Sequence, residues 1–375
     1  MDIQSDEAPP TYGFDCLPQE IVLDIASRLP ITSLLQFMFV RKSFYNLSHD
    51  PELVNLHLSR AVKNDPCITI NAHNQLYFLE FSDHGVEEGV VRKISNPIAN
   101  SMPGFQVVGS CQGLLYIYES LRSKGLYVYN PFTGDYKELP KFREKSLDFG
   151  FGFSPAINEY KVIRIIHYGH WLPRKRDIQG KMHWVALFGN YLGRNDRLIV
   201  SFDLADEVFR EVPIVDFGVD PRINKFHLAV LGGCLAVAIT LPHHTGRELE
   251  IWVMREYNVK ESWVKEFKIG AYTPNPNSVT QHWQPLLKVL CLLNNGKLLL
   301  EYNYLPYKYS GYLISYDPQS GVFRTLKFEG MPDLFKTIVH VGCLNWIDNP
   351  PAIFIKISPS NLSDTFLLKS LVVYV

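Results

Sequence analysis

Three short patterns in this chain of 375 residues contain residue types that can do chemistry. The first is Gly109-Ser110-Cys111-Gln112-Gly113, which has the glycine spacing of a nucleophile elbow with a thiol as the nucleophile. Such an elbow needs a helix after the nucleophile, whereas the apolar run after Gly113 predicts a strand. We therefore expect a turn between two strands here. An enzyme that uses Cys111 is the third hypothesis for this chain.

The other two patterns are histidine pairs and a glycine pair. His167-x-x-His170 and His243-His244 have no Cys or carboxylate partner at ligand spacing, so we expect neither a metal site nor a cofactor. Gly150-x-Gly152 lacks the third glycine and the helix of a dinucleotide-binding loop. It instead predicts a strand whose small residues let another backbone pass close by.

A basic cluster and several aromatic residues are candidates for binding another protein. The cluster Arg174-Lys175-Arg176 lies in a polar insertion, and its cations could contact an acidic or phosphorylated segment or act as a nuclear import signal. A solvated insertion without a role is the alternative, and loop aromatics can equally pack on neighbouring strands. Arginine and aromatic side chains are favoured at protein interfaces. The candidate substrate-binding residues are Trp171, Arg174, Arg176, Trp283, Tyr304 and Tyr307.

The composition excludes several classes of protein. The formal net charge is -1, so there is no basic field to hold nucleic acid, and no apolar run is long enough to span a membrane. The polar, acidic N-terminus does not resemble a secretory signal. The six cysteines are far apart in the sequence and contain no C-x-x-C pair, which predicts reduced thiols in a cytoplasmic or nuclear protein.

The segment from Leu17 to Arg60 contains the signals of four helices. The first helix starts at Pro18, which suits the first helical position, and either Thr32 or Ser33 can cap the second. A third short helix runs near residues 41–48, and Asp50 caps a fourth. The segment has more apolar side chains than a unit of this size can bury. The surplus either packs against the rest of the chain or, as we expect, forms a surface for a partner.

The rest of the chain predicts strands and turns, and one hairpin pattern recurs in it. An aromatic residue followed by Asn or Asp is followed six positions later by another aromatic residue, with polar turn residues between them. The Asn or Asp side chain can bond to its own turn. The three copies contain Tyr129, Asn130 and Tyr136; Phe202, Asp203 and Phe209; and Tyr316, Asp317 and Phe323.

Apolar strands that begin near glycine lie between the hairpins, and the last of them is expected at residues 341–347. One such strand with one hairpin gives a module of about 50 residues, the scale of a kelch-type blade. We therefore expect an α+β chain of two parts, a small all-α part and an all-β propeller of about six blades. A β-sandwich or an open barrel is the alternative.

The helical segment resembles the F-box motif over its full length. Met38, Phe39 and Phe44 stand where the family usually has Arg, Cys and Trp. The matching residues are Leu17, Pro18, Glu20 and Ile21; Ser27 to Pro30; Ser33 to Leu35; Val40, Lys42, Ser43 and Phe44; and Asp50 to Leu53. The β region resembles the plant-type F-box-associated domain, a kelch-like propeller. That resemblance rests on Ser110 to Leu115, Asn130 to Thr133 and Gly150 to Val162.

These resemblances imply a substrate-recognition subunit of an SCF-type cullin ubiquitin ligase, which is not itself an enzyme. A Skp-type adaptor would bind the helices, and the propeller would hold a protein whose identity the sequence does not reveal. A propeller scaffold outside any ligase is the alternative. The expected parts are a flexible N-terminus (1–15), the F-box (16–62) and the propeller (66–375). The expected adaptor-binding residues are Leu17, Pro18, Ile21, Leu29, Pro30, Leu34, Leu35, Phe39, Val40 and Phe44.

Overall fold

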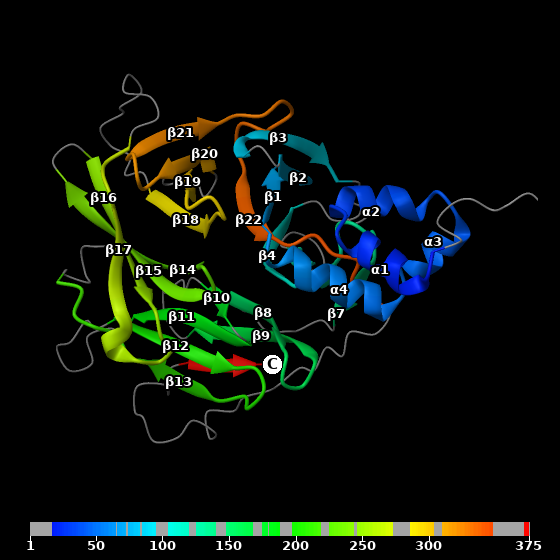
Figure 1. Ribbon diagram of the computed structural model, residues 1–375. Helices are drawn as coiled ribbons and strands as arrows, with labels where there is room; N and C mark the ends of the chain where they lie inside the picture. Colours follow the sequence, from blue (N-terminus) through cyan, green and yellow to red (C-terminus); the bar gives the residue numbers. More distant parts are fainter. Residues whose placement is uncertain are drawn as a thin grey trace, which may run out of the picture.

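The computed structural model places a group of helices beside a ring of β-sheets (Figure 1). None of the described helices is long and apolar enough to cross a membrane. The expected flexible N-terminus, residues 1–15, lies outside the described residues. The residues described are 17–64, 66–72, 74–82, 85–94, 104–119, 125–139, 148–167, 175–178, 180–187, 197–218, 225–243, 246–272, 286–303, 310–347 and 371–374.

Four helices form the N-terminal part, as predicted. They are α1 (Gln19–Ser27), α2 (Ile31–Met38), α3 (Lys42–Leu47) and α4 (Pro51–Ala61). Pro18 and Pro30 directly precede α1 and α2, and the Asp50 carboxylate caps α4 by accepting a hydrogen bond from the Glu52 backbone N–H at 2.9 Å. The prediction that Thr32 or Ser33 caps α2 is wrong, because α2 already begins at Ile31 and makes no side-chain capping bond.

The described strands form five four-stranded sheets and one three-stranded sheet. Sheet I has the order β22-β1-β2-β3, and sheet II the order β4-β5-β6-β7. Sheet III has the order β23-β9-β8. Their bounds are β1 Cys67–Ala72, β2 Gln75–Ser82, β3 Gly85–Lys93, β22 Lys336–His340, β4 Phe105–Cys111, β5 Leu114–Glu119, β6 Leu126–Tyr129, β7 Tyr136–Leu139, β8 Asp148–Ser154, β9 Glu159–His167 and β23 Leu371–Tyr374.

Sheets IV, V and VI each contain four consecutive strands, β10 to β13, β14 to β17 and β18 to β21. A short 3-10 helix, Lys260–Ser262, precedes β17. The bounds are β10 Lys175–Ile178, β11 Lys181–Leu187, β12 Arg197–Asp203, β13 Phe209–Val212, β14 Lys225–Leu231, β15 Cys234–His243, β16 Gly246–Met254, β17 Trp263–Ile269, β18 Leu286–Leu292, β19 Leu298–Asn303, β20 Ser310–Asp317 and β21 Val322–Leu326.

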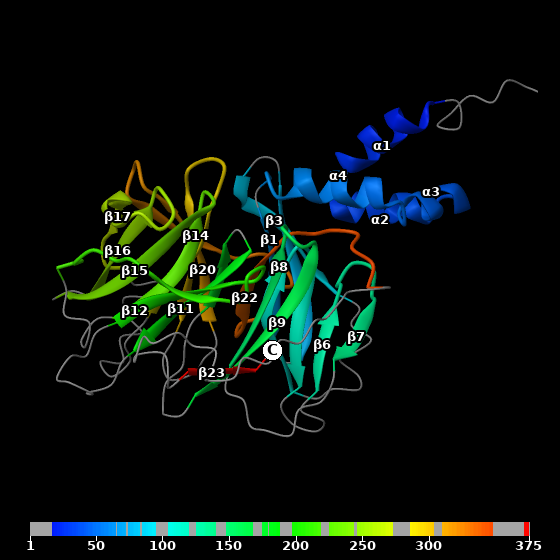
Figure 2. The same ribbon diagram turned by 90° about the horizontal axis from the view of Figure 1, so that it is seen from below.

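The sheets pack side by side in chain order, and sheet VI lies next to sheet I, which closes a propeller (Figures 1 and 2). The ring is closed within sheet I, where the late strand β22 pairs with the early strand β1 from Cys67↔His340 to Asn71↔Lys336. The all-β propeller is therefore confirmed, and the β-sandwich alternative is not. The expected count of six blades is not confirmed, because among the described residues five of the sheets are four-stranded blades and the sheet at β8 and β9 has three strands.

The predicted repeating hairpin is confirmed in three sheets. Its two aromatic residues are opposite each other in the ladder in every copy, as Tyr129↔Tyr136, Phe202↔Phe209 and Tyr316↔Phe323. The Asn or Asp side chain accepts hydrogen bonds from backbone N–H groups of its own turn, as predicted; for example, Asp203 Oδ1 accepts from Ala205 N at 2.9 Å. These local bonds explain why the pattern could be found in the sequence.

Two other sequence predictions needed correction. Residues 341–347 do not form a strand, because the ladder ends at His340. Beyond it, the Asn130 side chain next to β6 donates to the Asn345 carbonyl oxygen, and the Asn345 side chain donates to the Gln112 carbonyl oxygen and to the Tyr160 hydroxyl. The small residue Gly150 lies in β8, as expected, but the space beside it holds the Met182 side chain rather than a passing backbone, because a Cβ atom there would lie 2.7 Å from the Met182 Sδ and Cε atoms.

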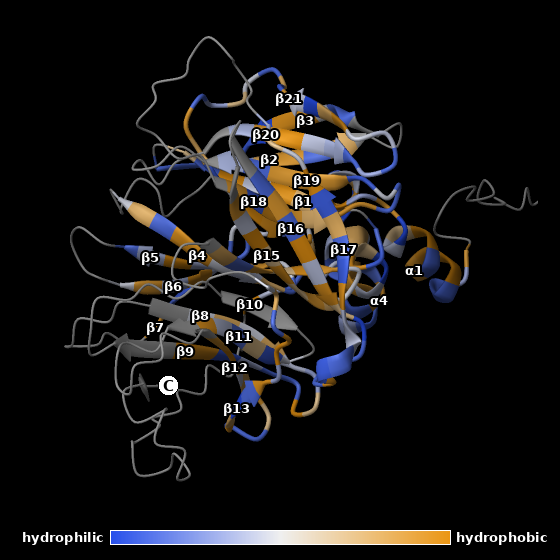
Figure 3. Ribbon diagram, turned by 90° about the vertical axis from the view of Figure 1, so that its left-hand side faces the viewer, coloured by the Kyte–Doolittle hydropathy of each residue, from blue (hydrophilic) through white to orange (hydrophobic). Residues whose placement is uncertain are grey.

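Each apolar core cluster lies between two neighbouring sheets. The core of the propeller therefore consists of the interfaces between adjacent sheets, which we call seams. Hydropathy follows this arrangement, since the middle strands are apolar and outer strands such as β17 carry exposed polar residues (Figure 3). Each seam also carries a hydrogen bond that involves a side chain. The six pairs are Ser110–His340, Gln112–Tyr160, Lys161–Glu207, His183–Tyr257, His227–Val289 and Glu301–Thr337.

Candidate protein-binding surfaces

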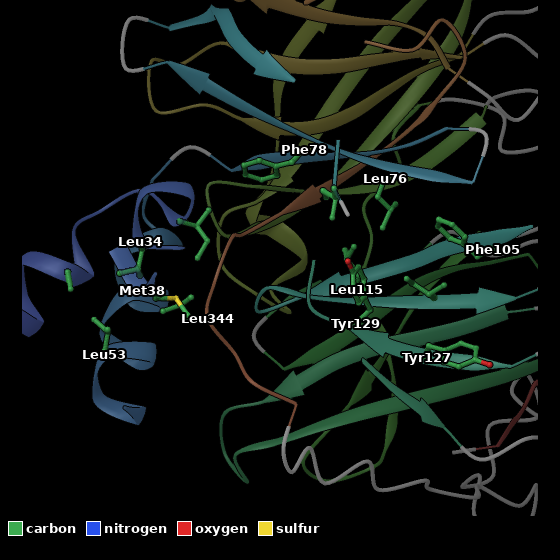
Figure 4. Close-up of a cluster of buried hydrophobic side chains, with 14 of the residues drawn as sticks. Leu34, Met38, Leu53, Leu76, Phe78, Phe105, Leu115, Tyr127, Tyr129 and Leu344 are labelled. Carbon is green, nitrogen blue, oxygen red and sulfur yellow. The ribbon is translucent and has the colours of Figure 1, made fainter. Parts of the chain in front are cut away.

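The helices share one apolar cluster with the propeller. Leu34, Met38 and Leu53 from the helices lie in the same buried cluster as Phe78 of β2 and Leu344, which follows β22 (Figure 4). Part of the apolar surplus of the helical segment is therefore buried inside the chain. The alternative that the helices pack against the β part is correct for this face of the segment.

Polar contacts also join the helices to the propeller. Thr32 Oγ1 donates to the Glu80 carboxylate on β2 at 3.1 Å, and Trp346 Nε1 donates to the Ser48 carbonyl oxygen at 2.9 Å. The Trp346 ring stacks on the His49 ring with 3.9 Å between centroids. These bonds fix the orientation of the helices on one side of the ring (Figure 2).

Most of the predicted adaptor-binding residues lie on the surface that the propeller leaves uncovered. Phe39 and Val40, at the end of α2, are 81% and 65% exposed. Leu29 and Leu35 are half-buried against the shared cluster. The other exposed members of the predicted set are Leu17, Pro18, Ile21 and Pro30.

Two of the predicted residues do not lie on this surface. Leu34 is 1% exposed and Phe44 is 8% exposed, and the Phe44 ring stacks on Phe37. Both therefore belong to the core of the chain, and the prediction that they face a partner is corrected. Sequence reasoning left out two apolar side chains of the helices that are exposed, Ile25 and Tyr45. Ile25 follows Ile21 at helical spacing, which is the signal that could have identified it.

We use the name exposed apolar face for the exposed apolar side chains at the start of and along α1, which are Leu17, Ile21 and Ile25, and at the end of α2, which are Phe39 and Val40. Large apolar side chains that are exposed together mark interaction sites on soluble proteins. The face belongs to helices whose other side is fixed on the propeller, so it is held in place before a partner arrives. Such pre-organisation reduces the entropic cost of association.

A carboxylate between two arginines joins the first and last helices. Asp24 Oδ2 accepts from Arg28 Nε at 3.0 Å, and Asp24 Oδ1 accepts from Arg60 Nη2 at 2.5 Å. Hydrogen bonds from Arg28 and then from Arg60 lower the pKa of Asp24 from 3.8 to about 2. Since Arg60 also donates to the Ser27 hydroxyl, the group holds α1 against the end of α4.

This carboxylate predicts an acid-sensitive contribution to the stability of the helical segment. Because the pKa of Asp24 is lower in the folded chain than in the unfolded chain, its contribution is complete above about pH 4 and is lost as the pH falls towards 2. Asp24→Asn should lower the melting temperature at pH 6, and the difference from the wild type should shrink as the pH approaches 2. Melting curves of both proteins from pH 2 to pH 6 measure this. A difference that is constant over that range would contradict the prediction.

The candidate substrate-binding residues lie outside the described side chains. Trp171, Arg174, Trp283, Tyr304 and Tyr307 are outside the described residues, and for Arg176 only the backbone, in β10, is described.

The two faces of the ring can nevertheless be distinguished at sheet VI. Asn294, just after β18, donates to the Lys63 carbonyl oxygen beyond α4, so this end of β18 faces the helices. The other end of β18 is Leu286, which pairs with Asn303, the last residue of β19. Leu286 and Asn303, which we call the outer ends of β18 and β19, therefore lie on the face of the ring away from the helices. The segments that contain Trp283 and Tyr304 adjoin these two residues in the sequence.

The thiol pattern that could have been catalytic is a turn. Cys111 ends β4 and pairs with Leu114, and Gln112 and Gly113 between them have φ angles of 43° and 79°, as in a two-residue hairpin turn. The strand β5 follows the turn, so the helix of a nucleophile elbow is replaced by a strand. Burial raises the pKa of the Cys67 and Cys343 thiols to about 12, which keeps them protonated.

Metal binding has no support among the described residues, since no three His, Cys, Asp or Glu side chains gather there in a way that could hold an ion. His170 and His244 lie outside the described residues, and the side chains of His167 and His243 are not described.

The fold defines a class of protein, a β-propeller with a helical segment fixed on one side of the ring. The F-box domain family matches residues 14–56, and the F-box associated beta propeller domain family matches residues 65–190 and 164–347. The chain therefore belongs to the F-box proteins that carry an F-box-associated β-propeller.

Two plant proteins with similar sequences agree with this assignment. The chain is 34% identical to the F-box protein At3g07870 of Arabidopsis thaliana, over 90% of this chain and 94% of that protein. It is 25% identical to the F-box protein CPR1 of the same plant, over 88% of each chain. Among solved structures, a putative 6-phosphogluconolactonase from Bacteroides fragilis covers 74% of this chain and 99% of its own, at 10% identity and a TM-score of 0.34.

Proposed function

We propose that this protein is the substrate-recognition subunit of an SCF-type cullin ubiquitin ligase. The observation that carries the proposal is the exposed apolar face on an F-box whose other side is fixed to the propeller. A Skp-type adaptor would cover this face and connect it to a cullin scaffold. The protein would form no bonds itself, and would promote ubiquitin transfer by holding a target protein close to the reactive thioester.

Adaptor binding provides the direct test. Val40→Asp should weaken binding to a Skp-type adaptor at least about tenfold, because it introduces a charge that complex formation would bury. Val90→Asp is the matched control, since Val90 on β3 is an exposed valine too, at 52% against 65% for Val40, but lies on the propeller. Titration calorimetry with purified full-length protein measures both affinities. If the wild type does not bind the adaptor, or if both variants bind equally well, the proposal is wrong.

We further propose that the target protein binds the propeller face away from the helices. The support is the position of the outer ends of β18 and β19, which adjoin the segments that contain Trp283, Tyr304 and Tyr307. Affinity capture with proteasome activity blocked would test this, comparing the wild type with a variant in which these three residues are alanine. Proteins lost from the variant, while the adaptor is retained, are the expected targets.

The scaffold hypothesis keeps one observation in its favour, the burial of one face of the helices against the propeller. A protein of that kind would hold its helices on the ring and have no Skp-type partner, so the adaptor titration distinguishes the two functions. Under the ligase proposal, the F-box comprises residues 16–62, the propeller residues 66–375, and the protein acts in the cytoplasm, the nucleus or both. Imaging of a fluorescent fusion tests the location.

A further inference from the structure

The segment that follows the ring-closing strand β22 is buried between the helices and the propeller. We call residues 341–347 the strap; in Figures 1 and 2 it runs from β22 towards the helices. Leu344 is fully buried in the cluster that the helices share with sheets I and II, whereas Ile347 is buried in a second cluster between sheets II and III. The helices and sheets I, II and III therefore all pack against one short piece of chain.

Polar groups of the propeller hold the backbone of the strap. Asn130 Nδ2 donates to the Cys343 and Asn345 carbonyl oxygens at 3.1 and 2.7 Å. Asn345 Nδ2 in turn donates to the Gln112 carbonyl oxygen at 2.7 Å and to the Tyr160 hydroxyl at 2.9 Å. These bonds replace the ladder that ends at His340, and they connect the strap to the turn of sheet II and to β9.

The helices hold the other side of the strap. Trp346 donates to the Ser48 carbonyl oxygen, its ring stacks on His49, and Tyr45 meets the ring edge-on with centroids 6.4 Å apart. A Cβ atom on Gly342 would lie 2.6 Å from the Ile31 side chain, so the backbone of the strap touches α2 directly. The helices and the propeller thus both contact the same seven residues of the strap.

We infer that the strap makes docking of the helices and closure of the propeller one cooperative event. Trp346 is the residue that joins the strap to the helices. The strap continues directly from β22, and β22 closes the ring by pairing with β1. When the helices leave the propeller, the strap loses the contacts of Trp346 and Leu344, and β22 loses the support of its C-terminal end. By linkage, a partner that binds only the docked helices stabilises β22.

Hydrogen exchange of the full-length chain tests this coupling without any partner. Trp346→Ala should accelerate exchange about tenfold both in residues 19–61 and in residues 336–347, because both open in one event. Trp252→Ala is the matched control, since Trp252 is also a half-buried tryptophan but lies on β16, in sheet V. Faster exchange in the helices with β22 unchanged would overturn the inference, as would equal effects of the two variants.

A milder variant covers the case in which Trp346→Ala does not fold. Trp346→Phe keeps a ring over His49 and removes the bond to the Ser48 carbonyl oxygen, so exchange should rise in the same two regions by a smaller factor, about threefold. A rise confined to one of the two regions would again overturn the inference.

Hydrogen exchange measured in the presence of a Skp-type adaptor extends the test. Only this measurement rests on the proposed function. Saturating adaptor should slow exchange in residues 336–347 in the wild type. If the adaptor binds and β22 exchanges as before, the coupling is wrong. If the adaptor does not bind, the proposed function fails, while the comparison of Trp346→Ala with Trp252→Ala still decides the coupling.

Discussion

Gly113→Ala is expected to destabilise the protein by about 3 kcal/mol, far more than the same change at another glycine of equal backbone conformation. Gly113 has a φ angle of 79°, and a Cβ atom there would lie 1.9 Å from Cys343 Sγ and 3.0 Å from the Val341 carbonyl oxygen. The methyl group would therefore displace the strap. Left-handed backbone alone costs an alanine only about 1 kcal/mol.

Gly134 separates the two contributions. Its φ angle is 80°, but a Cβ atom there would have no atom within 4 Å, so Gly134→Ala should cost only about 1 kcal/mol. Urea denaturation of both variants gives the two free energies of unfolding. Similar free energies of unfolding for the two variants would contradict the prediction, because they would show that the strap moves away from the added methyl group at Cys343 with little loss of stability.

The second large effect is expected at the seam between sheets III and IV. Lys161 on β9 has a side chain only 3% exposed, and its Nζ atom lies 2.7 Å from Glu207 Oε1 in the turn between β12 and β13. Glu207→Gln should destabilise the protein by about 3 kcal/mol, because it leaves a buried ammonium group without its counter-charge. Glu207 is one-third exposed, which places the value at the lower end of the range for buried pairs.

The partner substitution provides the control for this pair. Lys161→Met removes the buried charge and keeps an apolar chain of similar length, so it should cost about 1 kcal/mol, clearly less than Glu207→Gln. Chemical denaturation at one pH and salt concentration compares the two. If Lys161→Met proves the more harmful change, the pair contributes net attraction and our reasoning about desolvation is wrong.

The features that the sequence predicted are those set by neighbours along the chain. Asp50 caps α4, and Asn130 and Asp203 bond to their own turns, because these bonds reach only two or three residues. The pattern of apolar residues likewise predicted the helices. It could not say which apolar side chains of a short helix face the propeller, since Leu34 and Phe39 are equally apolar and only tertiary packing buries the first and exposes the second.

The features that the sequence did not predict depend on distant contacts. Residues 341–347 read as an apolar strand, but the Asn130 side chain, far away in sequence, takes the carbonyl groups that a ladder would have used. Thr32 or Ser33 was expected to cap α2, yet the Thr32 hydroxyl bonds to Glu80 on β2. In both cases a local preference gave way to a contact that exists only after the propeller has formed.

The pairing of β1 with β22 also has a consequence for synthesis on the ribosome. The β1 edge that receives β22 is made by Ala72, whereas β22 begins only at Lys336. At a rate of roughly 5–20 residues per second, that edge waits on the order of tens of seconds for its partner. An open strand edge is a template for aggregation during that time. The nascent chain is therefore most vulnerable before β22 emerges, and chaperones that shield strand edges should matter more for its yield than the stability of the finished ring.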